Sequence, residues 1–165
     1  MTNANTSLLP LHIALATAAL LPLAGCEKNN PETGVLVEHA WVRLPAVADG
    51  AAAGYFTATA GGNDALLAVS APGARVELHE TMSMGGTGAM GAMTGMRPIA
   101  RVALPAGDAV RFTPGGKHLM IFGLDPKLKK GGTVNLTFRF RKAPPVTAPA
   151  QLVGPADPPP EDAGS

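Results

Sequence analysis

The stretch Val134–Arg141, which reads VNLTFRFR, decides the fold class because apolar and polar side chains alternate along it without a break. Successive side chains of an extended strand point to opposite faces, so this pattern gives one apolar face and one polar face. A helix would need apolar residues at every third or fourth position instead. We therefore predict a half-buried β-strand, with one face on a core and the other in water.

Outward from this strand, the chain divides into further short stretches of strand-forming residues, several of which end at Pro or Gly. These stretches are Val35–Arg43, Tyr55–Ala60, Ala65–Ser70, Arg75–Glu80, Pro98–Leu104, Val110–Thr113 and His118–Leu124. A helix is expected only as a single turn near Pro126–Lys130. This spacing predicts an all-β domain, built as an antiparallel sandwich or barrel.

The charge balance and the cysteine count exclude several classes of protein. The 165 residues include 13 Lys and Arg against 12 Asp and Glu, so the net charge of +1 offers no field that would hold nucleic acid. The single cysteine, Cys26, rules out an intrachain disulfide, a cysteine-based zinc knuckle and an iron–sulfur cluster. A chain of this length is expected to form one domain.

The N-terminal segment is typical of an exported protein. Residues 8–26 read LLPLHIALATAALLPLAGC, an apolar run that is short for a membrane span of about 20 residues. Its end, Leu23-Ala24-Gly25-Cys26, resembles a bacterial lipoprotein signal. The resemblance implies that residues 1–25 are removed and that Cys26 is lipidated, which would anchor the protein to a membrane of the periplasm or cell envelope.

Composition divides the rest of the chain into three parts. Residues 26–34 are polar, with Pro and Gly, and are expected to form a tether. Residues 35–142 contain all of the expected strands. Residues 143–165 hold 7 of the 16 prolines and no aromatic residue, so we expect a disordered tail that buries too little apolar surface to offset its ordering.

Methionine is concentrated in one segment. Apart from Met1, all methionines lie between residues 82 and 120, and five of them fall within residues 82–96, namely Met82, Met84, Met90, Met93 and Met96. The segment is rich in glycine, which predicts a loop, and packing gives no reason for five thioethers in a loop. Thioether sulfur is a neutral, soft ligand that prefers Cu(I) to Zn²⁺, Mg²⁺ or Ca²⁺.

Two histidines flank the methionine-rich segment. His79 ends the strand that enters it, and His118 lies two residues before Met120, so His118 and Met120 share a face of their strand. We predict one cluster of imidazole and thioether groups that binds Cu(I). His39 is expected to be an ordinary surface or core residue and not a ligand. The alternatives are a flexible methionine-rich surface for a protein partner and a loop that scavenges oxidants.

Five short motifs and one spacing are distinctive. The motifs are VEHAWVRLP at 37–45, AAGYFTA at 52–58, VELHETM at 76–82, MRPI at 96–99 and PGGKHLMIFGL at 114–124. Met96 and His118 enclose 21 residues, and the His-x-Met triplet ends at Met120. In these motifs the chain resembles the periplasmic copper chaperones called PCuAC, over nearly all of residues 35–141.

The resemblance to PCuAC implies a fold, a ligand set and a role. The fold would be a cupredoxin-like antiparallel Greek-key β-sandwich or barrel, and one Cu(I) would bind to His79, Met96, His118 and Met120. The protein would deliver copper to cytochrome oxidase assembly, at the CuA site or a related centre. Its partner would be the copper-site subunit of the oxidase or another copper-assembly protein.

The spacing between His79 and Met96 is longer than in that family. Sixteen residues separate them, and the extra residues, roughly 85–92, are expected to be a loop insertion. Whether this region supplies auxiliary thioether ligands stays open for Met82, Met84, Met90 and Met93.

The cysteine that a blue-copper site would require and the serine motif that a hydrolase site would require are not found in the expected strands. A blue-copper electron carrier needs a thiolate ligand, and Cys26 lies outside the expected strands. No serine stands in a nucleophile motif such as Gly-x-Ser-x-Gly, so we do not expect an enzyme. Two functions remain, a Cu(I) chaperone and a copper-independent envelope lipoprotein whose methionine-rich loop binds a protein partner.

Overall fold

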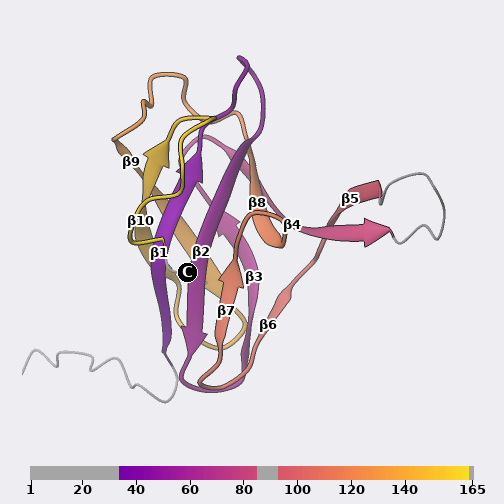
Figure 1. The fold of residues 1–165 in the computed structure, drawn as a ribbon. Coiled ribbons are helices and arrows are strands. Elements are labelled where there is room, and N and C mark those ends of the chain that lie inside the picture. The colour runs from indigo at the N-terminus through magenta and orange to yellow at the C-terminus, as the bar shows by residue number, and fades with distance from the viewer. Residues whose placement is uncertain (1–33, 85–92, 164–165) are drawn as a thin grey trace, which may run out of the picture.

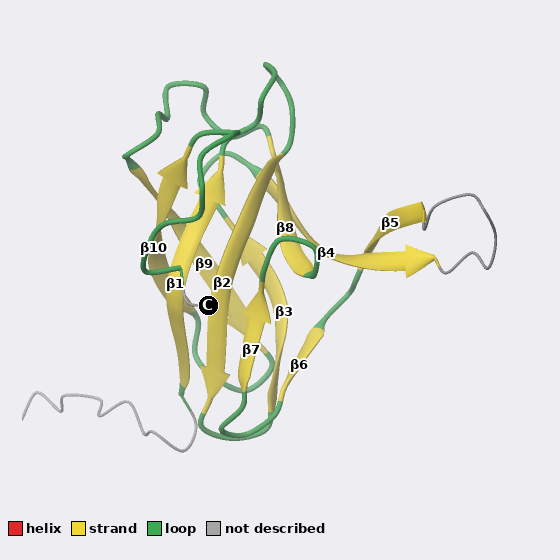
Figure 2. Cartoon of the chain, viewed as in Figure 1, coloured by secondary structure: helices red, strands yellow, loops and turns green. Residues whose placement is uncertain are grey.

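Ten strands make up the regular structure of residues 34–84 and 93–163, the part of the chain that the computed structural model describes (Figures 1 and 2). They are β1 (Val35–Arg43), β2 (Ala52–Ala60), β3 (Asp64–Ser70), β4 (Arg75–Met84), β5 (Met93–Pro98), β6 (Val102–Leu104), β7 (Ala109–Phe112), β8 (Lys117–Phe122), β9 (Thr133–Phe140) and β10 (Val146–Val153). The all-β prediction is confirmed. In place of the helical turn expected near Pro126–Lys130, a tight turn joins the Leu128 amide to the Asp125 carbonyl oxygen. Within the described ranges, no helix is long and apolar enough to cross a membrane.

One curled sheet contains all ten strands. Its order is β5-β4-β8-β2-β1-β10-β9-β3-β6, and β7 pairs with β2. The ladders between these strands are antiparallel except the one between β1 and β10, which is parallel. The twist of the strands curls the sheet into an open barrel whose inner face holds the core (Figure 1).

Alternate residues of each strand fill the inside of the curl. On β9 the alternation is complete, and the buried residues are Val134, Leu136, Phe138 and Phe140. Phe56 on β2 stacks on Phe112 of β7 with ring centroids 4.1 Å apart, and it meets Phe138 edge-on at 4.8 Å. Burial of an aromatic or aliphatic side chain of this size stabilises the fold by about 1.5–3 kcal/mol.

β2 changes partners along its length, and this change positions β8. Its first residues pair with β8, as Ala53 with Met120 and Gly54 with Leu119, whereas β7 takes over from Phe56 onward. A Cβ atom on Gly54 would lie 3.0 Å from Cδ1 of Leu119, so the absence of a side chain lets β8 pack close. β8 also pairs with β4, which brings the two strands that carry the predicted histidine ligands side by side.

The prediction of a disordered tail over residues 143–165 is wrong. Residues Val146–Val153 form β10, which lies between β9 and β1 in the sheet. The proline content misled the prediction. Proline has no N–H to donate to a neighbouring strand, but the ladder between β10 and β1 begins only at Gln151, so Pro149 does not interrupt it. An inward-facing pattern is present on β10, but alanine carries most of it, since its buried positions include Ala148, Ala150 and Leu152.

The chain beyond β10 also packs on the sheet. Trp41 and Tyr55 stack with ring centroids 4.3 Å apart, and together with Val153 they form a second, smaller apolar cluster. Ala163 packs against this cluster, and its amide donates to the carbonyl oxygen of Pro160. The ordered domain therefore extends to Ala163 and does not end at residue 142.

Asp64, at the start of β3, fastens the connection between β9 and β10. Its buried carboxylate accepts hydrogen bonds from the backbone amides of Ala65 at 2.7 Å, Lys142 at 3.0 Å and Ala143 at 2.8 Å. Burial alone would raise the pKa of Asp64, but these hydrogen bonds together outweigh it and hold the pKa below its usual value. The ionised carboxylate therefore stabilises the folded chain.

β4 and β5 form a hairpin that projects from the rest of the sheet (Figure 1), with a register that runs from His79–Pro98 to Met84–Met93. The prediction of a loop over residues 82–96 is wrong at both ends. Backbone pairing between two strands overrides the low strand propensity of Gly. The expected insertion, with Met90, lies outside the described residues, as do the expected signal at 1–25, Cys26 and the tether up to residue 33.

Candidate metal centre

His79 and His118 face each other on neighbouring strands. The ladder between β4 and β8 places them directly opposite each other. Their ring centroids lie 5.9 Å apart with the rings tilted by 38°, and both residues are buried, with exposed fractions of 9% and 6%. The fold therefore brings together two imidazoles that are 39 positions apart in the sequence.

One hydrogen bond determines which ring nitrogen of His118 carries the proton and which has the lone pair. Its Nδ1 lies 3.0 Å from the backbone carbonyl oxygen of Gly116. A carbonyl oxygen only accepts hydrogen bonds, so Nδ1 carries the proton and donates it. The neutral ring then keeps the lone pair of Nε2 available for a metal.

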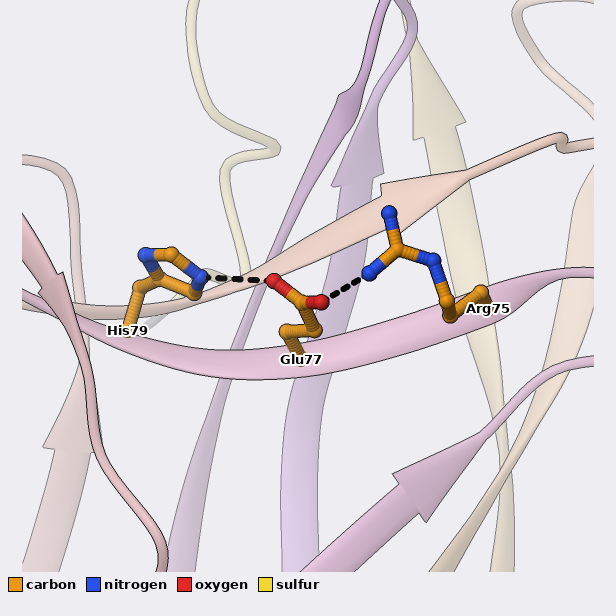
Figure 3. A network of polar contacts seen from close by, with 3 residues as sticks. All are labelled: Arg75, Glu77 and His79. Atoms are coloured by element: carbon orange, nitrogen blue, oxygen red, sulfur yellow. Dashed lines mark hydrogen bonds and ion pairs between the residues drawn. The ribbon is translucent and has the colours of Figure 1, made fainter.

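The ring of His79 is held by a carboxylate. Its Nε2 lies 3.0 Å from Oε2 of Glu77 (Figure 3). Its Nδ1 is buried and has no hydrogen-bond partner among the described residues. A buried nitrogen without a partner is costly, and a metal ion would satisfy its lone pair. This orphaned nitrogen is the feature of the structure that best fits a bound soft cation.

Met120 lies on the same face of the sheet as the two histidines. It follows His118 by two residues on β8, and it is directly opposite Glu77 on β4. It is half-buried. The register thus places one thioether on the face that carries both imidazoles.

Met96 and Met82 lie on opposite faces of the β4–β5 hairpin. Met96 is opposite Thr81, which is two residues from His79, so Met96 shares the face of His79. Met82 follows Thr81 directly and therefore lies on the other face. Both methionines are exposed, with fractions of 62% for Met96 and 39% for Met82. The hairpin register thus brings Met96, and not Met82, to the face of the histidines.

The remaining predicted residues whose backbone the structure describes are Met84, Met93 and His39. The backbones of Met84 and Met93 pair at the last position of the hairpin register. Met90 and Cys26 fall outside the described residues. His39 is exposed on β1 at a break in the ladder, where its φ of 54° departs from extended strand geometry.

An ion-pair cluster lies at the base of the hairpin, on the face opposite the histidines. Glu80 on β4 contacts Nζ of Lys117 on β8 at 3.0 Å and Nη2 of Arg97 on β5 at 3.1 Å. Hydrogen bonds from Lys117 and Arg97 hold the pKa of Glu80 below its usual value. Side chains as well as backbone bonds therefore join the three strands that carry the candidate ligands.

Glu77 is a site residue that sequence reasoning missed. It precedes His79 by two residues in the alternating motif VELHETM, so the shared face could be read from the sequence. The hydrogen bond to the ring of His79 could not, because it depends on the rotamers of both side chains.

Solved structures define the class of domain to which this fold belongs. The copper-bound PCuAC domain from PmoF2 superposes with a TM-score of 0.58 at 25% identity, over 73% of this chain and 93% of that one. The apo PCuAC domain from PmoF1 gives the same TM-score and identity, over 73% of this chain and 94% of that one. The fold is that of a cupredoxin-like PCuAC domain, and the resemblance seen in the sequence motifs is confirmed.

A described protein family and one relative of known sequence also match this chain. Residues 35–152 match the family described as "Putative lipoprotein LpqE-like", and the chain belongs to this LpqE-like family. The relative "Putative lipoprotein Lxx21020" of Leifsonia xyli subsp. xyli is 31% identical over 154 residues, which cover 86% of this chain and 89% of that protein. The family match reaches residue 152, in agreement with the place of β10 in the domain.

Proposed function

We propose that this protein is a Cu(I)-binding chaperone of the bacterial cell envelope. The observation that carries the proposal is the buried pair of His79 and His118, in which Nδ1 of one ring and Nε2 of the other are free to bind. Two thioethers, from Met96 and Met120, lie on the same face. Two imidazoles and two thioethers form a neutral, soft donor set that suits Cu(I). The copper-bound PCuAC domain from PmoF2 supports the proposal.

The four proposed ligands differ in exposure, and this difference suits transfer of the ion. His79 and His118 are buried, whereas Met96 is exposed on the hairpin. An acceptor can therefore replace Met96 first, so that a bond from Cu(I) to the acceptor forms as the bond to the thioether breaks. No electron is transferred, and copper remains Cu(I). The other ligands then exchange in turn, so the ion is never released into solution.

The proposed acceptor is the copper-site subunit of cytochrome oxidase, at CuA or a related centre, or another copper-assembly protein. This part of the proposal depends on the sequence motifs shared with PCuAC chaperones. In this role the protein carries an ion and catalyses no reaction of its own.

We also propose that Cys26 anchors the protein to a membrane of the periplasm or cell envelope. The signal-like ending at Cys26 supports this, as do the family description and the name of the Leifsonia relative, both of which are those of lipoproteins. The nine residues from Cys26 to Gly34 would span about 30 Å at most when fully extended. A tether of this length would raise the effective concentration of the domain near a membrane-bound acceptor.

A copper-independent envelope lipoprotein is the second candidate. The exposure of Met96 and Met82 on a projecting hairpin favours it, because flexible thioether side chains suit an adaptable protein-binding surface. The two candidates differ in one measurable property, the binding of Cu(I).

Anaerobic Cu(I) competition against a chromogenic chelator tests the chaperone proposal. We expect the wild-type protein to retain an equimolar amount of Cu(I) and His118→Asn to weaken binding strongly, because the variant lacks one of the two imidazole ligands. His39→Asn is the matched control, because it removes an exposed histidine and Asn tolerates the positive φ at this position. Equal competition by the wild type and His118→Asn would contradict the proposed site, and no binding by the wild type would leave the second candidate.

A further inference from the structure

Glu77 connects Arg75 to His79 along one face of β4, as Figure 3 shows. The alternation of the strand puts all three side chains on the same face. Nη1 of Arg75 contacts Oε1 of Glu77, while Oε2 lies 3.0 Å from Nε2 of His79. Each carboxylate oxygen therefore has its own partner, and Oε2 is the oxygen directed at the imidazole.

Arg75 is held in place by the neighbouring strand. Its guanidinium carbon lies 4.2 Å from the centre of the Phe122 ring, and Phe122 is directly opposite Arg75 in the β4–β8 ladder. A guanidinium over an aromatic face is attracted by the ring electrons. The row of three side chains is thus fixed at one end by Phe122 and at the other by the buried ring of His79.

We propose that Glu77 is a positioning residue that makes His79 a metal ligand through Nδ1. A carboxylate only accepts hydrogen bonds, so Nε2 of His79 carries the proton. The lone pair of the neutral ring is then on Nδ1, the buried nitrogen without a partner among the described residues. At His118 the assignment is reversed, because the carbonyl oxygen of Gly116 holds the proton on Nδ1 and leaves Nε2 free. The inference rests on the proposed function for the identity of the metal.

Loss of Glu77 should weaken metal binding without removing a ligand. The ring of His79 would then lose the hydrogen bond that fixes its orientation and would divide between two tautomers, of which only the one with a lone pair on Nδ1 is ready to bind. Groups that orient a metal-bound histidine commonly contribute about 10–100-fold to affinity. We therefore expect Glu77→Ala to lower the Cu(I) affinity about tenfold.

Nitrogen NMR of the apo protein tests the inference, because two-bond ¹H–¹⁵N spectra report the tautomer of each histidine ring. We expect Nε2–H at His79 and Nδ1–H at His118 in the wild type. Glu77→Ala should mix the tautomers at His79 alone and weaken Cu(I) competition about tenfold. Glu77→Gln, whose side-chain oxygen still accepts from Nε2–H, should keep the tautomer and most of the affinity.

Glu80→Ala is the matched control, because it removes a carboxylate from the same strand on the opposite face and should leave the His79 tautomer unchanged. An Nδ1–H tautomer at His79 in the wild type would overturn the inference. So would Glu77→Ala with unchanged tautomers or unchanged affinity, or an equal loss of affinity in Glu77→Gln. A wild type with the expected tautomers that binds no Cu(I) would overturn the proposed function, and with it the ligand role of Nδ1.

Discussion

His79 and His118 stand directly opposite each other in the β4–β8 ladder, and each ring makes one hydrogen bond, which leaves its other nitrogen without a partner among the described residues. Backbone pairing holds the Cα atoms of directly opposite residues about 4.5–5.5 Å apart. The two imidazoles therefore need little ordering to meet a metal, because the sheet has already placed them. Met96, by contrast, lies exposed on the projecting hairpin.

The hairpin register predicts that the thioether of Met96 contributes to Cu(I) binding and that the thioether of Met82 does not. Met96→Leu keeps a side chain of similar size but removes the sulfur from the face of His79. We expect it to weaken Cu(I) binding about tenfold, or about 1.4 kcal/mol. Met82→Leu changes the other face and should leave the affinity unchanged. Anaerobic chelator competition measures both variants, and equal losses would show that the hairpin does not separate the two sulfur atoms.

The fold class and most strand positions could be predicted from the sequence because burial follows alternation. β1 has the predicted bounds, and β9 buries every second residue, as the pattern VNLTFRFR predicted. β10 could not be predicted in this way, because Ala148 and Ala150 give a weak apolar signal and Pro149 interrupts it. Of the two partners that stabilise β10, β9 directly precedes it and was predicted as a strand, but β1 is distant in the sequence and its pairing with β10 was not evident.

The candidate site could be predicted in part. The His-x-Met triplet and alternation predicted that His118 and Met120 share a face, and the ladder places them so. The sequence could not predict that His79 lies opposite His118, because that register depends on which strands become neighbours. The sequence also could not show on which face Met96 lies, because the glycine-rich segment 82–96 predicted a loop and not a paired strand.

Deletion of residues 85–90 should leave a closed hairpin with full Cu(I) affinity. The last pair of the register is Met84–Met93, so the deletion would leave Gly91-Ala92 as a two-residue turn, with Gly at the position that a type II′ turn favours. A shorter loop costs less ordering entropy, so the affinity should be equal or higher. Chelator competition measures it. A loss of Cu(I) affinity of about tenfold, or about 1.4 kcal/mol, in a folded variant would instead indicate that Met90 is a ligand.

Asp64→Asn should destabilise the domain at neutral pH and reduce its loss of stability in acid. The variant loses hydrogen bonds from backbone amides to a charged group, worth about 2 kcal/mol in total. The pKa of Asp64 is lower in the folded chain than in the unfolded chain. The carboxylate therefore stabilises the folded domain in full above the unfolded pKa, about 4, and this stabilisation is lost as the pH falls through the folded pKa. Urea unfolding across this pH range measures the effect. If the free energy of unfolding changed with pH in the same way in the wild type and in Asp64→Asn, the carboxylate would not have this stabilising role.

Cys26→Ser should abolish lipid attachment. The thiol is the only one in the chain, so no other residue can form the thioether expected at the end of the signal. Growth with a radioactive fatty acid should label the wild type and leave the variant unlabelled and released from the membrane fraction. Equal labelling of both proteins, or a mature chain that begins at another residue, would refute the anchor.

X-ray absorption at the copper edge of the Cu(I)-loaded wild type tests the proposed metal centre most directly, because it counts nitrogen and sulfur neighbours. We expect nitrogen scattering from His79 and His118 and sulfur scattering from Met96 and Met120, with Cu(I) unchanged in oxidation state. Met96→Leu should lose part of the sulfur signal and keep the nitrogen signal. A copper shell without sulfur, or one whose sulfur signal is the same in Met96→Leu, would contradict the proposed ligand set.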